Sequence, residues 1–218
     1  MGTNHMGRQS IRFPQPPVVR GFASVAGKKE REGPLGDQFT ATVQDTTFGE
    51  KSWERAERRM QQMTLELALE KAGLTDADLE AAFAGDLLNQ CIGSSFSLRN
   101  RGVPTLGLYG ACSTMAESLL LAAMSVSGGY ARTALAMTSS HFASSERQYR
   151  FPLGYGGQRT PTSQWTVTGA GAVLLGSGEH GIRITAATIG SIVDRGICDA
   201  NNMGAAMAPA AFATLRAH

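Results

Sequence analysis

The most informative segment of this 218-residue chain reads Leu106-Gly107-Leu108-Tyr109-Gly110-Ala111-Cys112-Ser113-Thr114, and an apolar run over residues 115–126 follows it. An apolar segment, a turn of small residues with a thiol, and a longer apolar run are typical of a strand, a sharp turn and a buried helix. Cys112 then lies at a helix N-terminus, where free N–H groups and the helix dipole favour a thiolate or a bound carboxylate. Cys112 is therefore a candidate nucleophile or part of a carboxylate site, and the alternative is a small buried apolar residue.

The overall composition fits a globular protein with one large domain or two small ones. Hydrophobic residues make up 42% of the chain and the formal net charge is +2, so we expect no nucleic-acid partner. Because the sequence has no apolar run of about 18 residues and no charged and apolar leader, we expect neither a transmembrane helix nor a signal peptide. Three cysteines at irregular spacings, Cys91, Cys112 and Cys198, favour free thiols in a reducing compartment over disulfides or a metal site.

The N-terminal part of the chain gives weak signals. Residues 1–20 are predicted to form a flexible lead-in, with residues 1–10 poorly ordered and an extended stretch around Pro14, Pro16 and Pro17. The polar segment 28–37 is interpreted as a solvated loop.

A long amphipathic helix is predicted next. Ser52 is a suitable N-cap for a helix that runs to about Ala72, and Gly73 ends it. Apolar residues spaced by three and four form one face of this helix, which we interpret as core contact: Trp53, Ala56, Met60, Met63 and Leu67. A short capped turn of helix is expected over residues 74–79.

Asp86 follows a predicted strand over residues 79–84, and a helical segment to about Asn100 follows Asp86. In open α/β sheets ligands gather beyond the carboxyl ends of the strands, so this carboxylate is a candidate for a ligand site. The alternative is a helix N-cap, which Asp favours equally well.

The order of strands and helices predicts an α/β fold. Strands over residues 103–109 and 133–138 flank the helix that follows Cys112, and a strand, helix, strand alternation at this spacing implies right-handed crossovers and a mostly parallel sheet. His141 lies just after the second strand. It is a candidate base, although a structural histidine is the more common case.

The later part of the chain contains an irregular segment over residues 142–165. Arg147, Arg150 and Arg159 are candidate carboxylate ligands there, because a guanidinium can bind a carboxylate through two hydrogen bonds; solvated loop charge is the alternative. Residues 166–176 are interpreted as a glycine turn that leads into a strand, and residues 182–189 as a further strand. The glycines do not form a phosphate loop, because no Lys-Ser/Thr pair follows them.

These features together resemble the thiolase and ketoacyl-synthase superfamily, and more narrowly the stage V sporulation protein AD family. The narrower resemblance rests on six motifs between Gly33 and the end of the chain: Gly33-Pro34-Leu35-Gly36, Lys51-Ser52-Trp53-Glu54, Ala84-Gly85-Asp86-Leu87-Leu88-Asn89-Gln90, Gly110-Ala111-Cys112-Ser113-Thr114, Thr138-Ser139-Ser140-His141 and Met203-Gly204-Ala205-Ala206-Met207-Ala208-Pro209-Ala210-Ala211.

The resemblance implies a thiolase-like layered α/β fold, here its N-terminal half over residues 21–218. It also implies a non-catalytic role in spore formation, namely binding of dipicolinic acid (pyridine-2,6-dicarboxylate), alone or as its calcium chelate, for uptake into the developing spore. Asp86, Cys112 and Ser113 match the ligand-binding positions of the family. The implied location is the cytoplasmic face of the spore inner membrane, in the forespore or the mother-cell cytosol, with the membrane proteins of the same operon as partners. No cofactor is implied apart from calcium carried with the ligand.

The chain stops where the resemblance implies a second half. A half sheet leaves an apolar face uncovered, so we expect a homodimer, an unstable chain or completion by another chain. The alternative function is an acyl-transferring condensing enzyme similar to 3-oxoacyl-carrier-protein synthase III, with Cys112 as the nucleophile. The partner residues of that cysteine lie in the second half in the relatives. A structural scaffold within a membrane-associated complex is a third possibility.

Overall fold

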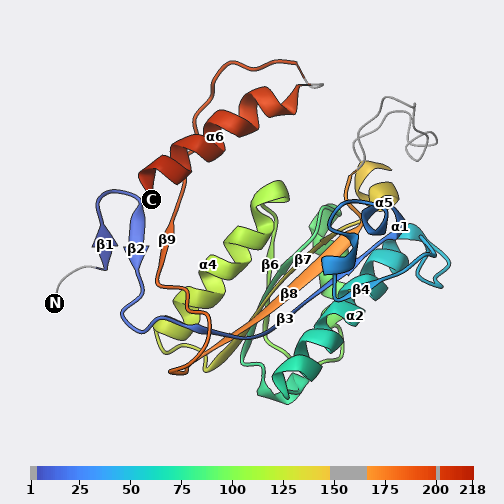
Figure 1. The fold of residues 1–218 in the computed structure, drawn as a ribbon, viewed down its shortest axis with the longest axis horizontal. Helices are drawn as coiled ribbons and strands as arrows, with labels where there is room; N and C mark the ends of the chain where they lie inside the picture. The colour runs from blue at the N-terminus through green and yellow to red at the C-terminus, as the bar shows by residue number, and fades with distance from the viewer. Residues whose placement is uncertain (1–3, 148–165, 200–201) are drawn as a thin grey trace.

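A six-stranded sheet forms the centre of the molecule, and the computed structural model describes residues 4–147, 166–199 and 202–218 (Figure 1). Five of the strands point the same way and β8 runs against them, since its pairings with β3 and β7 are antiparallel and the others are parallel. The expected mostly parallel sheet is confirmed. The strands, in their order across the sheet, are β4 (Ala41–Thr42), β3 (Val18–Ala26), β8 (Gly169–Gly176), β7 (Thr133–Ser140), β5 (Ala81–Gly85) and β6 (Thr105–Leu108).

Two long helices cover opposite faces of this sheet (Figure 1). α2 (Trp53–Ala72) packs Leu65, Ala68 and Leu69 on one face, and α4 (Thr114–Ser127) packs Ala122, Ala123 and Val126 on the other. Successive strand residues point to opposite faces, so β7 contributes Leu135 and Met137 to the α2 side and Ala134 and Ala136 to the α4 side.

The predicted helix over residues 52–72 is confirmed. The Ser52 side chain accepts a hydrogen bond from the backbone N–H of Arg55, and Gly73 ends the helix in the left-handed conformation, with a φ of 64°. Met60 and Ala56 are fully buried, as the apolar stripe predicted. The capped turn is also present as η2 (Asp76–Asp78), where Thr75 and Asp78 form a capping box.

Short helical segments connect the larger elements. α1 (Lys28–Arg31) and η1 (Gly36–Gln38) lie in the segment that was expected to be an irregular loop. The others follow the ends of strands: η3 (Asn89–Cys91) and α3 (Ile92–Leu98) after β5, η4 (Ala111–Ser113) after β6, and α5 (Phe142–Arg147) after β7.

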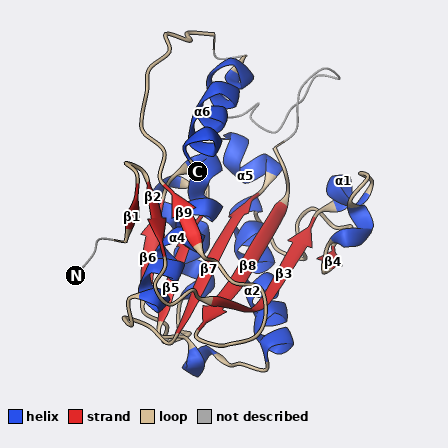
Figure 2. Ribbon diagram, turned by 60° about the vertical axis from the view of Figure 1, so that its left-hand side comes forward, coloured by secondary structure: helices blue, strands red, loops and turns tan. Residues whose placement is uncertain are grey.

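The N-terminal residues are more ordered than the predicted flexible lead-in. β1 (His5–Met6), β2 (Ser10–Arg12) and β9 (Ala186–Thr188) form a small antiparallel sheet beside the central one (Figure 2). Phe13 and Val18 are both buried, and Phe13 belongs to the apolar core on the α4 side of the sheet. α6 (Met203–Ala217) lies against this small sheet, where the Ser10 hydroxyl donates to the carbonyl of Ala217 at 3.2 Å.

Two further expectations need correction. The glycines at 169 and 171 belong to strand β8 and not to a turn before it, because both are paired in the sheet: Gly169 lies opposite Ala26 and Ser140, and Gly171 lies opposite Ser24 and Thr138. α4 is buried on one side only: Ser118, Ala122 and Ala123 are inaccessible, whereas Met124 is 43% exposed. The apolar composition of this helix had suggested burial all round.

Candidate functional site

The cysteine turn joins the edge strand β6 to the N-terminus of α4, as predicted. Cys112 and Ser113 are both exposed, so Cys112 is not the small buried residue of the alternative interpretation. The Ser113 hydroxyl donates to the carbonyl of Gly110 at 2.8 Å. A Cβ atom at Gly110 would lie 2.6 Å from Ser113 Oγ and 2.5 Å from the Glu117 carboxylate, so both side chains would have to move to admit one.

Asp86 lies directly after β5, at the same edge of the sheet as the cysteine turn, but its carboxylate points into the protein. Only 1% of Asp86 is exposed. Its Oδ2 accepts from the backbone N–H and the hydroxyl of Ser94, at 2.7 and 2.6 Å, and its Oδ1 accepts from the N–H of Leu88 at 2.9 Å. Asp86 thus binds the first turn of α3 and holds the loop between β5 and α3 closed, a role close to the capping alternative.

Two hydrogen bonds connect this loop to the cysteine turn. Cys91 Sγ donates to the carbonyl of Leu108 at 3.1 Å, and the Tyr109 hydroxyl donates to the carbonyl of Leu87 at 3.3 Å. Gln90 and Cys91 both have a positive φ, 60° and 51°, which non-glycine residues adopt only where the surroundings enforce it. The structure therefore brings the segments of Asp86 and Cys112 together, with Asp86 inside and Cys112 and Ser113 at the surface.

A buried chain of polar side chains extends from Asp86 to α2. Ser94 accepts from the Gln61 amide at 3.2 Å, and the same amide donates to Ser139 at 2.7 Å. Ser139 donates to Glu57 at 2.8 Å. Glu57 and Gln61 are both fully inaccessible. The sequence analysis did not identify these residues, since a buried Glu on an amphipathic helix has the same local signature as a solvated one.

Burial changes the acidity of Glu57. Loss of hydration raises the pKa of this carboxyl from 4.5 to about 7, and the negative charge of Asp86 acts in the same direction. The hydroxyls of Ser144 and Ser139 oppose this shift, because they donate to the ionised form. Near neutral pH Glu57 is therefore partly protonated and partly ionised.

His141 has a structural role. It is fully buried, its Nε2 lies 2.8 Å from the carbonyl of Thr46, and its Nδ1 accepts from the N–H of Ala143 at 3.1 Å. Burial lowers the pKa of the imidazole. Since both ring nitrogens are occupied, His141 is not available as a base, in line with the structural interpretation.

The remaining sequence candidates lie elsewhere. The backbone of Arg147 ends α5, while Arg150 and Arg159 lie outside the described residues. Cys91, Cys112 and Cys198 are free thiols in the structure. Within the described parts of the chain, no three His, Cys, Asp or Glu side chains gather into a metal site, and no helix is long and apolar enough to cross a bilayer.

The layered arrangement, with the cysteine turn between strand and helix, is a thiolase-like fold. The fold resembles the priming beta-ketosynthase of the R1128 polyketide biosynthetic pathway, with a TM-score of 0.51 and 16% identity, over 81% of this chain and 53% of that one. A second similar structure is 3-oxoacyl-(acyl-carrier-protein) synthase III from Aquifex aeolicus VF5, with a TM-score of 0.48 and 16% identity, over 75% of this chain and 55% of that one. The likeness to the priming beta-ketosynthase confirms the predicted fold class.

The chain belongs to the stage V sporulation protein AD (SpoVAD) family, whose family model matches residues 7–218. Stage V sporulation protein AD of Bacillus subtilis (strain 168) is 44% identical over 212 residues. That alignment includes 97% of this chain and 63% of the Bacillus protein, so the chain spans less than two thirds of its relative. The resemblance inferred from the six motifs is confirmed.

Proposed function

We propose that this member of a sporulation family binds dipicolinic acid, free or as its calcium chelate, for uptake into the developing spore. The observation that carries the proposal is the exposed pair Cys112 and Ser113 at the N-terminus of the 14-residue helix α4. Unpaired N–H groups and the helix dipole favour a carboxylate at that position. The calcium ion arrives bound to the ligand in this proposal.

Asp86 supports the site indirectly. Its carboxylate accepts hydrogen bonds from Ser94 and Leu88, so it holds the loop between β5 and α3 in place. That loop in turn bonds to Leu108 at the end of β6 and to Tyr109 just after it. Loss of this carboxylate would loosen the cysteine turn without removing a direct ligand contact.

The location and the partners follow from the same proposal. The chain acts at the cytoplasmic face of the spore inner membrane, together with membrane proteins of the same operon. A second copy of the chain is a further proposed partner, because part of the apolar sheet face on the α4 side is exposed.

Calorimetric titration of dipicolinate into the folded chain, with and without calcium, tests the proposal. We expect saturable binding that Cys112→Ala and Ser113→Ala each weaken by about tenfold, because each substitution removes a polar side-chain group that contacts the ligand in this proposal. Cys198→Ala is the matched control, since it removes another exposed thiol. A folded chain without saturable binding, or an equal loss in the control, contradicts the proposal.

A matched pair on α3 tests the indirect role of Asp86. Ser94→Ala removes a hydroxyl that donates to Asp86 and should cost about 1–3 kcal/mol of stability and weaken dipicolinate binding. Ser95→Ala changes an exposed serine of the same helix and should do neither. Urea denaturation and calorimetry measure both effects, and unchanged binding in Ser94→Ala would show that the loop does not position the site.

Acyl transfer by Cys112 makes a different prediction, namely an acyl adduct. In the described part of the chain Cys112 Sγ has no hydrogen-bond partner, and His141 has no free ring nitrogen. Mass spectrometry after incubation with acyl thioesters distinguishes the two functions, because only a condensing enzyme should carry an acyl group on Cys112.

A further inference from the structure

A groove with a volume of about 320 Å³ lies between the first turns of α2 and the outer side of α3. It does not contain Cys112, Ser113 or Asp86. Three arginines from these two helices line it, namely Arg55, Arg58 and Arg99, against a single carboxylate, Glu54. Its size is at the lower end of the range for small-molecule sites.

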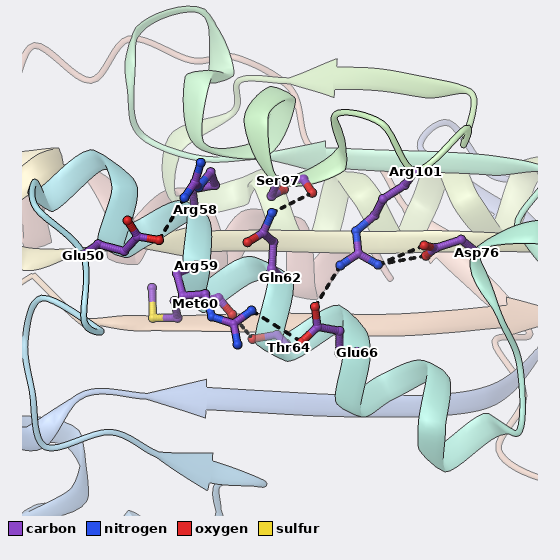
Figure 3. A network of polar contacts seen from close by, with 10 residues as sticks. All are labelled: Glu50, Arg58, Arg59, Met60, Gln62, Thr64, Glu66, Asp76, Ser97 and Arg101. Atoms are coloured by element: carbon purple, nitrogen blue, oxygen red, sulfur yellow. Dashed lines mark hydrogen bonds and ion pairs between the residues drawn. The ribbon is translucent and has the colours of Figure 1, made fainter.

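The charges of these arginines are only partly compensated. Arg58 Nη2 binds the Glu50 carboxylate at 2.8 Å, as Figure 3 shows, but Arg58 Nε is buried and has no hydrogen-bond partner among the described residues. No carboxylate within the described ranges is within ion-pair distance of Arg55 or Arg99. A buried N–H without an acceptor is rare in folded proteins and costs stability.

The rest of the groove is apolar and accessible. Ile92 and Phe96 of α3 line it, and each is 43% exposed. The Arg99 guanidinium lies over the Phe96 ring, 5.0 Å from its centroid, which holds a cation beside a flat apolar surface. Guanidinium groups bind carboxylates and phosphates through paired hydrogen bonds, and an exposed aromatic ring favours a planar neighbour.

The two sides of α3 therefore differ: one is buried and polar, and the other is exposed and apolar. Ser94 and Ser97 point into the buried polar chain, and the Ser97 carbonyl accepts from Gln62 of α2 at 3.5 Å (Figure 3), so the wall of the groove is fixed to the core. Ile92 and Phe96 remain free on the outer side. We propose that this groove binds a small anion, a carboxylate or phosphate group carried on a flat apolar body.

Titration of the ¹⁵N-labelled chain with benzoate and with phenyl phosphate, followed by NMR, tests the inference. We expect saturable shifts of amide signals from α2 and α3, and a dissociation constant about tenfold larger in Arg55→Gln and in Arg99→Gln, because each loses a charge-assisted hydrogen bond. Both arginines are exposed, so these variants should fold. The matched control is Arg59→Gln on the same helix, whose guanidinium lies 3.6 Å from Glu66 and does not line the groove.

Three outcomes would overturn the inference: no saturable shifts, equal weakening in Arg59→Gln, or binding that Cys112→Ala abolishes while the arginine variants retain it. The last outcome would place the probe at the cysteine turn, so the groove and the dipicolinate site are tested separately. Vesicles of phosphatidylcholine with phosphatidylglycerol distinguish the source of the anion. Arginine-dependent binding to the vesicles, without binding of benzoate or phenyl phosphate, would replace the small ligand by a lipid surface and contradict the proposal.

Discussion

The two carboxyl groups of the buried polar chain, those of Asp86 and Glu57, differ in their hydrogen-bond donors. Asp86 accepts three hydrogen bonds, from the backbone N–H groups of Leu88 and Ser94 and from the Ser94 hydroxyl. Glu57 accepts two hydroxyl hydrogen bonds deep between α2 and the sheet, and its pKa of about 7 reflects the cost of burying its charge. The two acids are connected through Ser94, Gln61 and Ser139.

Glu57 should make stability depend on pH. The pKa in the folded chain, about 7, exceeds the ordinary value of 4.5, so the folded state binds the proton more tightly between these values. Stability should therefore fall by roughly 3 kcal/mol as the pH rises from about 4.5 to about 7, because a tenfold difference in proton affinity corresponds to about 1.4 kcal/mol. Glu57→Gln resembles the protonated acid and should remove this dependence, as urea denaturation at several pH values would measure.

The control for this prediction is Glu70→Gln, which neutralises an exposed carboxylate on the same helix. It should retain the pH dependence of the parent chain. If Glu57→Gln and the parent lose stability equally over the window, the assigned proton affinity of Glu57 is wrong.

At the level of elements, the ends of the helices are set by local chemistry. Gly73 adopts a φ of 64° at the C-terminus of α2, and a side chain there would meet no other atom within 4 Å. The position therefore needs glycine for its backbone conformation and not for space.

Gly73→Ala should destabilise the chain by about 1 kcal/mol, since an L-residue in the left-handed region costs that much. Gly171→Ala is the matched control, because it also meets no atom within 4 Å but lies in strand β8 without a positive φ. Thermal denaturation should show a lower midpoint for Gly73→Ala alone. Equal losses in both variants would show that the strain at Gly73 is negligible.

At the level of the whole molecule, α4 covers only part of its face of the sheet. Beside it lies an open apolar groove of about 280 Å³, lined by residues of β3, β8, α4 and the segment before β9, including Phe22, Val173 and Ile184. Phe22 is 56% exposed in this groove. Accessible apolar surface of this kind favours association.

Phe22→Ser should reduce self-association of the chain by about thirtyfold or more, because a buried aromatic side chain contributes roughly 2 kcal/mol or more to an interface. Sedimentation measurements over a range of concentrations would show this. Tyr130→Ser is the control, since Tyr130 is 88% exposed at the end of α4 and does not line the groove. A parent chain that stays monomeric at all concentrations, or an equal effect of both variants, would contradict the prediction.

The sequence by itself determined the elements with strong local signals. The cap at Ser52, the stop at Gly73 and the three-and-four spacing fixed α2, and the small-residue turn fixed Cys112 at the start of α4. These signals act between residues a few positions apart, so they can be recognised in a linear chain. The predictions of a lead-in over residues 1–20 and of a glycine turn before β8 were less accurate, because both segments pair with strands that are distant in the sequence.

Only the tertiary structure decided how the polar residues are used. Glu57 and Ser139 are 82 residues apart, and Gln61 and Ser94 are 33 residues apart, yet they form one hydrogen-bonded chain. The sequence placed Asp86 at the correct edge of the sheet, but the direction of its carboxylate follows from the first turn of α3 folding back over it. The arginine groove likewise requires α2 and α3 to pack side by side. Burial and charge compensation depend on what surrounds a side chain in three dimensions, and local sequence patterns do not carry that information.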